Sequence, residues 1–310
     1  IVHLDLSSSP TPDGNPENDD KRFGVDILKG AYTGRTADGY AWIDSDTTGG
    51  PVYSWIDTVG ANSAIQREDE FRIFVPIGFD FPYSDTTYNN CYVCTNGWLS
   101  LGYDPHEFAP NPQRIPDNNL PNALIAPWWD DIELRSAGKV YYKTIGETPN
   151  RQFVVIWQDV NLKYTDTTEL VTFEAILNEN GTVVFQYQEV TTGDLNYDYG
   201  KNASIGIEDQ EGTAGVNYLY SLPPLSVATN DPQNRLTPGR AIKLYREFRD
   251  AAALDIVTPG IYTFPETLNP QVKIQNYGTV GDSIWTFLRV MPGGYFDSIL
   301  VTGLAPGAET

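Results

Sequence analysis

Short strand-like runs separated by turn residues recur along most of this chain, and no stretch has the spacing of a long amphipathic helix. β-Branched and aromatic residues, which favour strands, dominate these runs, and the chain has 19 Tyr and 7 Trp against a single Met. The 27 Gly and 22 Pro residues are spread between the runs, as in a chain with many turns. This pattern predicts an all-β fold, most simply a two-sheet antiparallel sandwich. Strands are expected at residues 71–81, 91–102, 139–144, 153–160, 170–177, 182–190 and 203–207.

The clearest local signal is the sequence Asn178-Glu179-Asn180-Gly181, which lies between two of these runs. Asn-Gly readily adopts the positive φ angles of a tight hairpin turn. The sequence therefore predicts that the runs on either side pair antiparallel through this turn.

The chain divides into three predicted segments. Residues 1–20 form an extended N-terminal arm and linker, residues 21–249 a large antiparallel β-sandwich, and residues 250–310 a smaller immunoglobulin-like sandwich. The last segment holds about five strand patterns, whereas a complete immunoglobulin-like sandwich has about seven strands in roughly 100 residues. We therefore expect this last sandwich to be incomplete and to expose an open edge.

The N-terminal arm has the alternation of a short strand, with Ile1, Val2, Leu4 and Leu6 as its apolar residues. Residues 7–20 are rich in Ser, Pro, Asn and Asp, so an extended linker should tether this strand. A strand from a neighbouring molecule can complete an open sheet edge without any new fold. Because donor and acceptor lie at opposite ends of the chain, the sequence predicts head-to-tail self-association, which builds a filament unless it closes into a ring.

The formal net charge of −21, from 41 acidic and 20 basic side chains, argues against polyanionic partners. DNA, RNA and anionic membrane surfaces would be repelled at long range. No window approaches the ~20 apolar residues of a membrane-spanning helix. The chain begins Ile1-Val2-His3 without an initiator Met, the pattern of an end left by signal-peptide removal or by trimming. We expect an extracellular or cell-surface protein.

The sequence contains no motif of a known catalytic site. The two histidines, His3 and His106, lie near no nucleophile motif, and no serine-hydrolase, zinc-protease, P-loop or dinucleotide-binding signature is present. Cys91 and Cys94 form a CxxC, but in a strand they face opposite sides with Cα atoms about 10 Å apart, too far for a disulfide. We expect unpaired structural cysteines and no enzyme activity.

Carboxylates in the predicted loops are candidates for a calcium site, because Ca²⁺ prefers carboxylate oxygens. Asp130 and Asp131 are the first candidates. The alternative is that loop carboxylates cap turns and accept backbone hydrogen bonds. Further acidic pairs are Asp44 with Asp46 and Glu208 with Asp209.

Three tryptophans, Trp98, Trp128 and Trp129, are candidates for a sugar-stacking platform, with core packing as the alternative. Adjacent residues of a strand point to opposite faces, so one of Trp128 and Trp129 is expected to be exposed. We take Trp129 as the candidate ligand-binding residue and a surface glycan as its candidate ligand.

Six ordered motifs resemble a known family. They are GYAWIDSD from Gly39, GGPVYSWID from Gly49, IGFDFPY from Ile77, VCTNGWLSLG from Val93, LIAPWWDDI from Leu124 and SIGIED from Ser204. Over residues 37–245 they resemble the nidogen-like β-sandwich of bacterial secreted and surface proteins. The last segment, with IQNYG from Ile274 and GLAPG from Gly303, resembles an adhesion-type immunoglobulin-like (CARDB-like) module. The resemblance implies an extracellular accessory or scaffold role and carries no catalytic residues.

Three functions remain open at this point. The leading hypothesis is a non-catalytic extracellular structural subunit, joined into a filament or surface assembly by strand addition. The second is an accessory or adhesive module of a larger secreted protein or peptidase. The third, from a different class, is a calcium-dependent carbohydrate-binding module.

Overall fold

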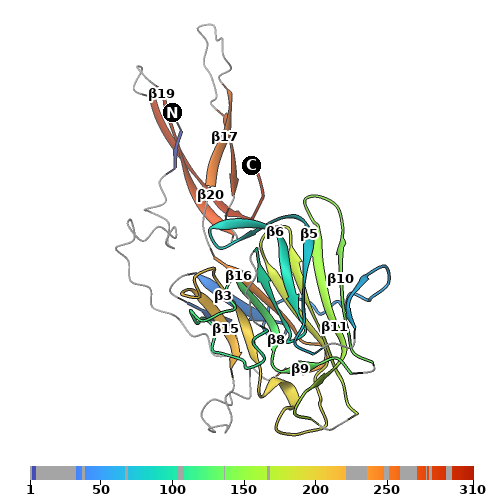
Figure 1. Ribbon diagram of the computed structural model, residues 1–310. Coiled ribbons are helices and arrows are strands. Elements are labelled where there is room, and N and C mark those ends of the chain that lie inside the picture. The colour runs from blue at the N-terminus through green and yellow to red at the C-terminus, as the bar shows by residue number, and fades with distance from the viewer. Residues whose placement is uncertain are drawn as a thin grey trace. The chain divides into compact units, whose positions relative to one another are not determined.

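A computed structural model of the protein describes most, but not all, of the sequence. The described residues are 2–4, 33–36, 39–66, 69–102, 108–135, 137–165, 168–220, 236–247, 251–258, 271–276, 278, 281–290 and 295–310. Within them the chain is built from strands, with one short 3-10 helix, η1 (Asp198–Gly200), and the all-β prediction is confirmed. The chain divides into two compact units (Figure 1). The large unit is Leu28–Tyr245, and the small unit is Ile1–Ile27 with Arg246–Thr310.

Two antiparallel sheets make up the large unit (Figure 1). The nine-stranded sheet has the order β2 (Thr33–Arg35), β3 (Tyr40–Asp44), β16 (Ala241–Arg246), β13 (Val183–Glu189), β12 (Val171–Asn178), β11 (Gln152–Leu162), β10 (Lys139–Ile145) and β4 (Asn62–Gln66), with β9 (Ile132–Glu133) paired to β11. The six-stranded sheet has the order β15 (Gly215–Tyr220), β14 (Ser204–Glu208), β8 (Leu124–Trp129), β7 (Trp98–Leu101), β6 (Thr86–Cys94) and β5 (Arg72–Tyr83). The predicted antiparallel sandwich is therefore present.

One predicted strand is divided in two. The run at residues 91–102 forms β6 and β7, which pair antiparallel with Cys94 opposite Trp98. The turn between them is possible because Gly97 adopts a φ of +75°, which side chains disfavour. A Cβ at Gly97 would also lie 1.7 Å from the carbonyl oxygen of Trp128, so this position accepts only glycine. The strand-like run at residues 91–102 thus contains the end of one strand, a turn and a second strand.

The hairpin predicted at Asn178–Gly181 joins β12 and β13, with Leu177 opposite Val183. Gly181 donates its backbone N–H to the Asn178 carbonyl at 2.9 Å and has a φ of +85°. Among residues 179–181 only Gly181 has a positive φ. The connection is thus a three-residue loop that ends in a left-handed glycine, rather than the tightest two-residue turn.

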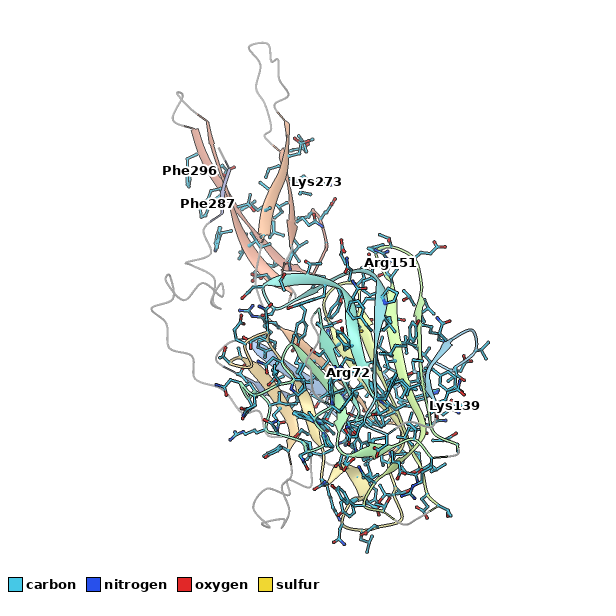
Figure 2. The ribbon with its side chains drawn as sticks, viewed as in Figure 1. Arg72, Lys139, Arg151, Lys273, Phe287 and Phe296 are labelled. Carbon is cyan, nitrogen blue, oxygen red and sulfur yellow. The ribbon has the colours of Figure 1, made fainter. Side chains whose placement is uncertain are left out.

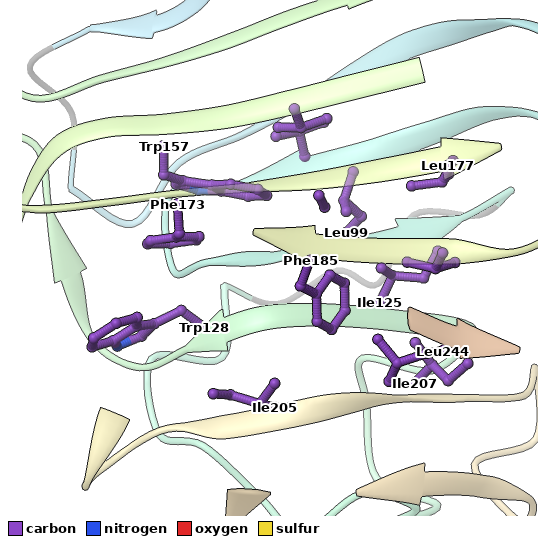
Figure 3. Close-up of a cluster of buried hydrophobic side chains, with 14 of the residues drawn as sticks. Leu99, Ile125, Trp128, Trp157, Phe173, Leu177, Phe185, Ile205, Ile207 and Leu244 are labelled. Atoms are coloured by element: carbon purple, nitrogen blue, oxygen red, sulfur yellow. The ribbon is translucent and has the colours of Figure 1, made fainter. Parts of the chain in front are cut away.

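Aromatic rings fill the space between the two sheets of the large unit. Trp157 of β11 stacks on Phe173 of β12 with ring centroids 5.1 Å apart, and Phe173 stacks on Trp128 of β8 at 5.6 Å (Figure 3). Hydrogen bonds also link the sheets, because the Trp157 indole donates to the Cys94 carbonyl at 2.9 Å. Such rings contribute the largest buried areas in a core, so this stack fixes how the two sheets face each other.

The two cysteines are free and buried, as expected. Cys91 belongs to the core between the sheets, and Cys94 belongs to a smaller cluster with Trp98 and Trp129. The predicted placement on opposite faces of the strand is confirmed. Burial raises the pKa of Cys91 well above its usual range and that of Cys94 to about 12, so both thiols stay protonated and unreactive at neutral pH.

The small unit contains two small sheets. In one, β17 (Ala251–Thr258) pairs with β18 (Gln271–Asn276), and residues 308–310 bond to the other side of β18 through Ile274 and Asn276. In the other, the order is β1 (Val2–Leu4), β19 (Asp282–Val290) and β20 (Tyr295–Leu304). Their shared core consists of Ile274, Ile284 and Leu304 with a few partly buried neighbours. The structure has no helix with the length and hydrophobicity of a membrane span among the residues that it describes.

Candidate functional site

The N-terminal strand is paired with the small unit of the same chain. β1 runs antiparallel to β19, with Val2 opposite Leu288, His3 opposite Phe287 and Leu4 opposite Thr286. The sequence predicted that this arm adds to the C-terminal segment of a neighbouring molecule, and here the same two elements pair within one molecule. Of the four predicted assembly residues, Val2 and Leu4 lie in β1, whereas Ile1 and Leu6 lie outside the described residues.

The strand that receives β1 has one buried and one more exposed face. Ile284 and Thr286 are buried, at 0% and 3% exposure, and the Thr286 hydroxyl has no hydrogen-bond partner among the side chains and backbone that the structure describes. On the alternate positions, the ring of Trp285 lies 6.2 Å from that of Phe287, which lies 5.8 Å from that of Phe296 on β20. Figure 2 shows Phe287 and Phe296 close together on these two strands. β19 therefore combines a buried face with an aromatic ladder on the opposite face.

Of the predicted metal residues Asp130 and Asp131, Asp131 lies in a cluster of described carboxylates that does not include Asp130. Asp131 lies beside Asp69 and Glu70, with one carboxylate oxygen of each within 4.8 Å of the others. Asp130 lies outside this group. It is 1% exposed, and its Oδ1 accepts hydrogen bonds from the Asp131 backbone N–H and the Asn202 side chain, both at 2.9 Å.

Burial determines the protonation of Asp130. Its Oδ2 has no hydrogen-bond partner within the described part of the chain, and burial raises the pKa of the carboxyl to about 7. Burial therefore favours the neutral form of the Asp130 carboxyl over the ionised form. A neutral carboxyl is a poor calcium ligand, so the structure favours Asp131 over Asp130 as a cation ligand.

An ammonium group already lies in the acidic cluster. Lys163 Nζ is 3.1 Å from Asp69, 3.8 Å from Glu70 and 3.7 Å from Asp131. The hydrogen bond to Asp69 raises the pKa of Lys163, which keeps it charged, while burial raises the pKa of both Glu70 and Asp131. Three carboxylates fit part of a Ca²⁺ shell of six to eight oxygens, provided that Lys163 moves away.

Asn96, in the turn between β6 and β7, brings the loops of this cluster together. Its side chain donates to Glu70 at 3.1 Å and accepts from the Ile132 backbone N–H at 2.9 Å. Sequence reasoning missed Asp69, Glu70 and Lys163. Three consecutive acidic residues before β5, at positions 68–70, were the available signal, but only the fold shows that Asp69 and Glu70 lie next to Asp131.

The prediction that Trp128 and Trp129 face opposite sides is confirmed, and the expectation that one of them is exposed was wrong. Trp128 is 0% exposed in the core between the sheets, and Trp129 is 2% exposed in the smaller cluster with Trp98. The Trp129 indole donates to the Ala109 carbonyl at 2.6 Å. A second layer of residues covers this face of the sheet, so Trp129 has no free ring face for a sugar.

The other acidic pairs serve structural roles. Asp44 accepts from the hydroxyl of Thr47 at 3.1 Å, and Asp209 accepts from the backbone of Thr213 at 2.8 Å. Glu208 accepts the backbone N–H of Asp117 at 2.8 Å. These contacts match the turn-capping alternative. His106, the remaining catalytic candidate, lies outside the described residues, and of His3 only the backbone is described.

Comparisons with known proteins find a family that matches the large unit. A family described as NIDO related matches residues 44–244. Alpha-tectorin from Homo sapiens and alpha-tectorin from Mus musculus are each 26% identical over 204 residues, which is 55% of this chain and 9% of the relative. The chain therefore spans a small part of the length of these relatives. No solved structure matches.

Proposed function

Because the chain belongs to the NIDO-related family, we propose that it is a non-catalytic extracellular structural protein whose copies join when the N-terminal strand of one molecule pairs with β19 of another. The observation that carries this proposal is the β1–β19 pairing, with its defined register. A strand that pairs with its own chain can make the same contact with a second copy, which is the exchange known as domain swapping. Head-to-tail exchange extends into a filament unless the rotation between copies closes a ring.

The strand order of the small unit supports this role for β1. In immunoglobulin-like sandwiches, strands A, B and E share one sheet, while strand C pairs with F and, in variable-type domains, with C′. β17, β18 and residues 308–310 follow the order A, B and E, and β19 with β20 follows C and C′. On this assignment β1 takes the position of strand F, so the arm supplies a strand that the sandwich requires.

The length of the connection sets the conditions for exchange. Residues 5–32 join β1 to β2 of the large unit, a stretch that reaches up to about 100 Å when extended. A tethered partner has an effective concentration of about a millimolar. Exchange between copies should therefore dominate where the protein is concentrated to a similar level, as it is when many copies gather on a surface.

Paired cysteine variants test the exchange. Directly opposite residues of antiparallel strands have Cα atoms about 4.5–5.5 Å apart, within the range of a disulfide. Mixing Val2→Cys molecules with Leu288→Cys molecules under oxidising conditions should yield a covalent hetero-dimer that increases with protein concentration. Mixing Val2→Cys with Thr302→Cys, which lies on β20 away from β1, provides the matched control.

Electron microscopy of the same samples tests the assembly. Filaments that disappear after deletion of residues 1–6, while the large unit keeps its unfolding transition, would support the proposal. If no hetero-dimer forms at any concentration and both samples stay as single particles, strand exchange is excluded. The chain would then act as an accessory or adhesive module of a larger secreted protein.

Calcium binding is a second candidate function, favoured by the cluster of Asp69, Glu70 and Asp131. Lys163 competes with a cation for these three carboxylates, so Lys163→Gln should increase Ca²⁺ affinity and Asp131→Asn should lower it. Isothermal titration with calcium chloride measures both effects. Absence of binding by wild type and by Lys163→Gln at millimolar calcium would remove this candidate, together with calcium-dependent sugar binding.

A further inference from the structure

β20 forms an edge of the β1-β19-β20 sheet. It is ten residues long and pairs with β19 on one side, and no described strand pairs with its other side. Three of its apolar side chains are solvent-exposed: Phe296 at 61%, Ile299 at 62% and Leu300 at 38%. A long edge strand with exposed apolar residues is a template for pairing with another strand.

A second long edge strand of this chain, β5, carries several features that oppose pairing with a further strand, and β20 carries fewer of them. β5, at the edge of the six-stranded sheet, carries Pro76 and Pro82, an exposed Asp80 and an irregular register between Pro76 and Phe81. These are the usual devices against edge-to-edge pairing. β20 has no Pro or Lys, and it pairs with β19 in regular register from Tyr295 to Val301, with its one irregularity between Val301 and Leu304.

The distribution of charged residues favours a second copy of this chain as the partner that pairs with β20. With a net charge of −21, two copies repel each other over most of their surfaces. Residues 298–304 carry no charge, so like-charged copies can approach closely along this stretch. The strand is also self-complementary. With Leu300 opposite Leu300 in an antiparallel pair, Ile299 faces Val301, and the single charged residue of the strand, Asp297, faces Gly303.

From these features, we propose that the β20 edges of two copies pair antiparallel about Leu300. The two sheets then join into one continuous sheet with the order β1-β19-β20-β20-β19-β1. The contact is isologous and closes on itself as a two-fold dimer, in contrast to the open head-to-tail contact made by β1. It involves the opposite edge of the sheet and does not depend on the proposed strand exchange.

Disulfide trapping of the full chain tests the register. Leu300→Cys places two thiols opposite each other at the two-fold axis, so oxidation should give a covalent homodimer. Thr302→Cys is the matched control, because in this register residue 302 faces Ser298 and not itself. The two native cysteines are buried and take no part. Dimer formation by Thr302→Cys at the same rate as by Leu300→Cys, or by neither variant, would overturn the proposal.

Two further variants separate this contact from its alternatives. Leu300→Lys brings two ammonium groups together and should abolish the dimer in sedimentation velocity. The circular dichroism spectrum of the full chain should stay unchanged. Val2→Cys combined with Leu288→Cys, oxidised at low protein concentration, locks β1 onto β19 of its own molecule and should leave the β20 dimer intact in sedimentation velocity. Loss of the dimer in this locked chain would assign the association to exchange of β1 and contradict pairing through β20.

Discussion

Three buried carboxyl groups in the large unit have raised pKa values. Burial raises the pKa of Glu174 and of Glu208 to about 8, and that of Asp130 to about 7. Glu174 is 0% exposed and accepts hydrogen bonds from the Ile56 backbone at 3.2 Å and from Gln186 at 2.7 Å. Its second oxygen has no partner among the residues with described positions. The neutral form of each group fits its surroundings better than the charged form.

The stability of the large unit should therefore fall as pH rises. A carboxyl with a folded pKa of about 8 and an unfolded pKa of about 4.5 contributes fully below pH 4.5, and this contribution is lost as pH rises towards 8. Glu174→Gln keeps a neutral acceptor and should recover roughly 2–4 kcal/mol of unfolding free energy at high pH. Urea unfolding between pH 5 and pH 9 measures the effect.

Substitution of an exposed glutamate, Glu147→Gln, controls for the loss of one negative charge. If the pH profile of Glu174→Gln equals that of wild type and of this control, Glu174 does not titrate in this range, and its burial would have to be less complete than the structure indicates.

Gly97 should tolerate no substitution because a side chain there would clash with the backbone, and Gly60 serves as the matched control. Gly97 and Gly60 both have a φ of +75°, but a Cβ at Gly97 would lie 1.7 Å from the Trp128 carbonyl, whereas Gly60 has nothing within 4 Å. Gly60→Ala should cost about 1 kcal/mol of backbone strain, and Gly97→Ala about 3 kcal/mol or more, because the β6–β7 turn must move. Denaturation midpoints of the two variants give the comparison. Equal losses would mean that the turn can move away without cost.

At the scale of elements, the segment at residues 51–59 runs over the outer face of the nine-stranded sheet. Gln186 binds the Ser54 backbone through both its amide oxygen and its amide nitrogen, and Glu174 binds the Ile56 N–H. Trp55 and Ile56 pack there against Val154, Ile156 and Ile176. Two side chains of the sheet thus replace the backbone pairing that would hold this segment if it were a strand.

Removal of the hydrogen bonds between Gln186 and Ser54 should make residues 51–59 more mobile without unfolding the sandwich. Gln186→Leu deletes the amide contacts to Ser54, so amide hydrogen exchange at residues 54–58 should accelerate, and so should proteolysis at this segment. Gln158→Leu is the matched control, because within the described chain the Gln158 side chain bonds to its neighbour Asp159 and not to residues 51–59. Unchanged exchange in Gln186→Leu would show that packing of Trp55 and Ile56 alone holds the segment.

The sequence predicted elements better than contacts between them. Each strand-like run contains a strand within a few residues of its expected bounds, because alternation and β-propensity are local properties. Within the run at residues 91–102, the turn depends on a glycine that approaches Trp128, a residue far along the chain, and this contact cannot be read from local sequence. The calcium hypothesis paired Asp131 with its neighbour Asp130, whereas the fold pairs it with Asp69 and Glu70 across two loops. Exposure of Trp129 was mispredicted because only the fold shows what covers the second face of the six-stranded sheet.

At the scale of the whole molecule, the excess of 41 acidic over 20 basic residues opposes any contact between copies. Salt screens this repulsion, since the Debye length falls from about 20 Å at 0.02 M salt to about 4 Å at 0.5 M. Association through the uncharged β20 edge should therefore strengthen as salt increases. Sedimentation velocity across this range tests the prediction, with Leu300→Lys as the control. A contact that weakens with salt would instead depend on ion pairs and would not lie at residues 298–304.

The buried thiols have a consequence for where this protein can be made. The chain contains two cysteines, both of them free and covered by the core, and its described fold has no covalent cross-link to form or to lose. Folding therefore needs no thiol oxidant and no disulfide isomerase, and the two thiols are in the same state in a reducing cytoplasm as in an oxidising exterior. Because both native thiols are buried, a cysteine introduced at an exposed position is the reactive thiol for labelling.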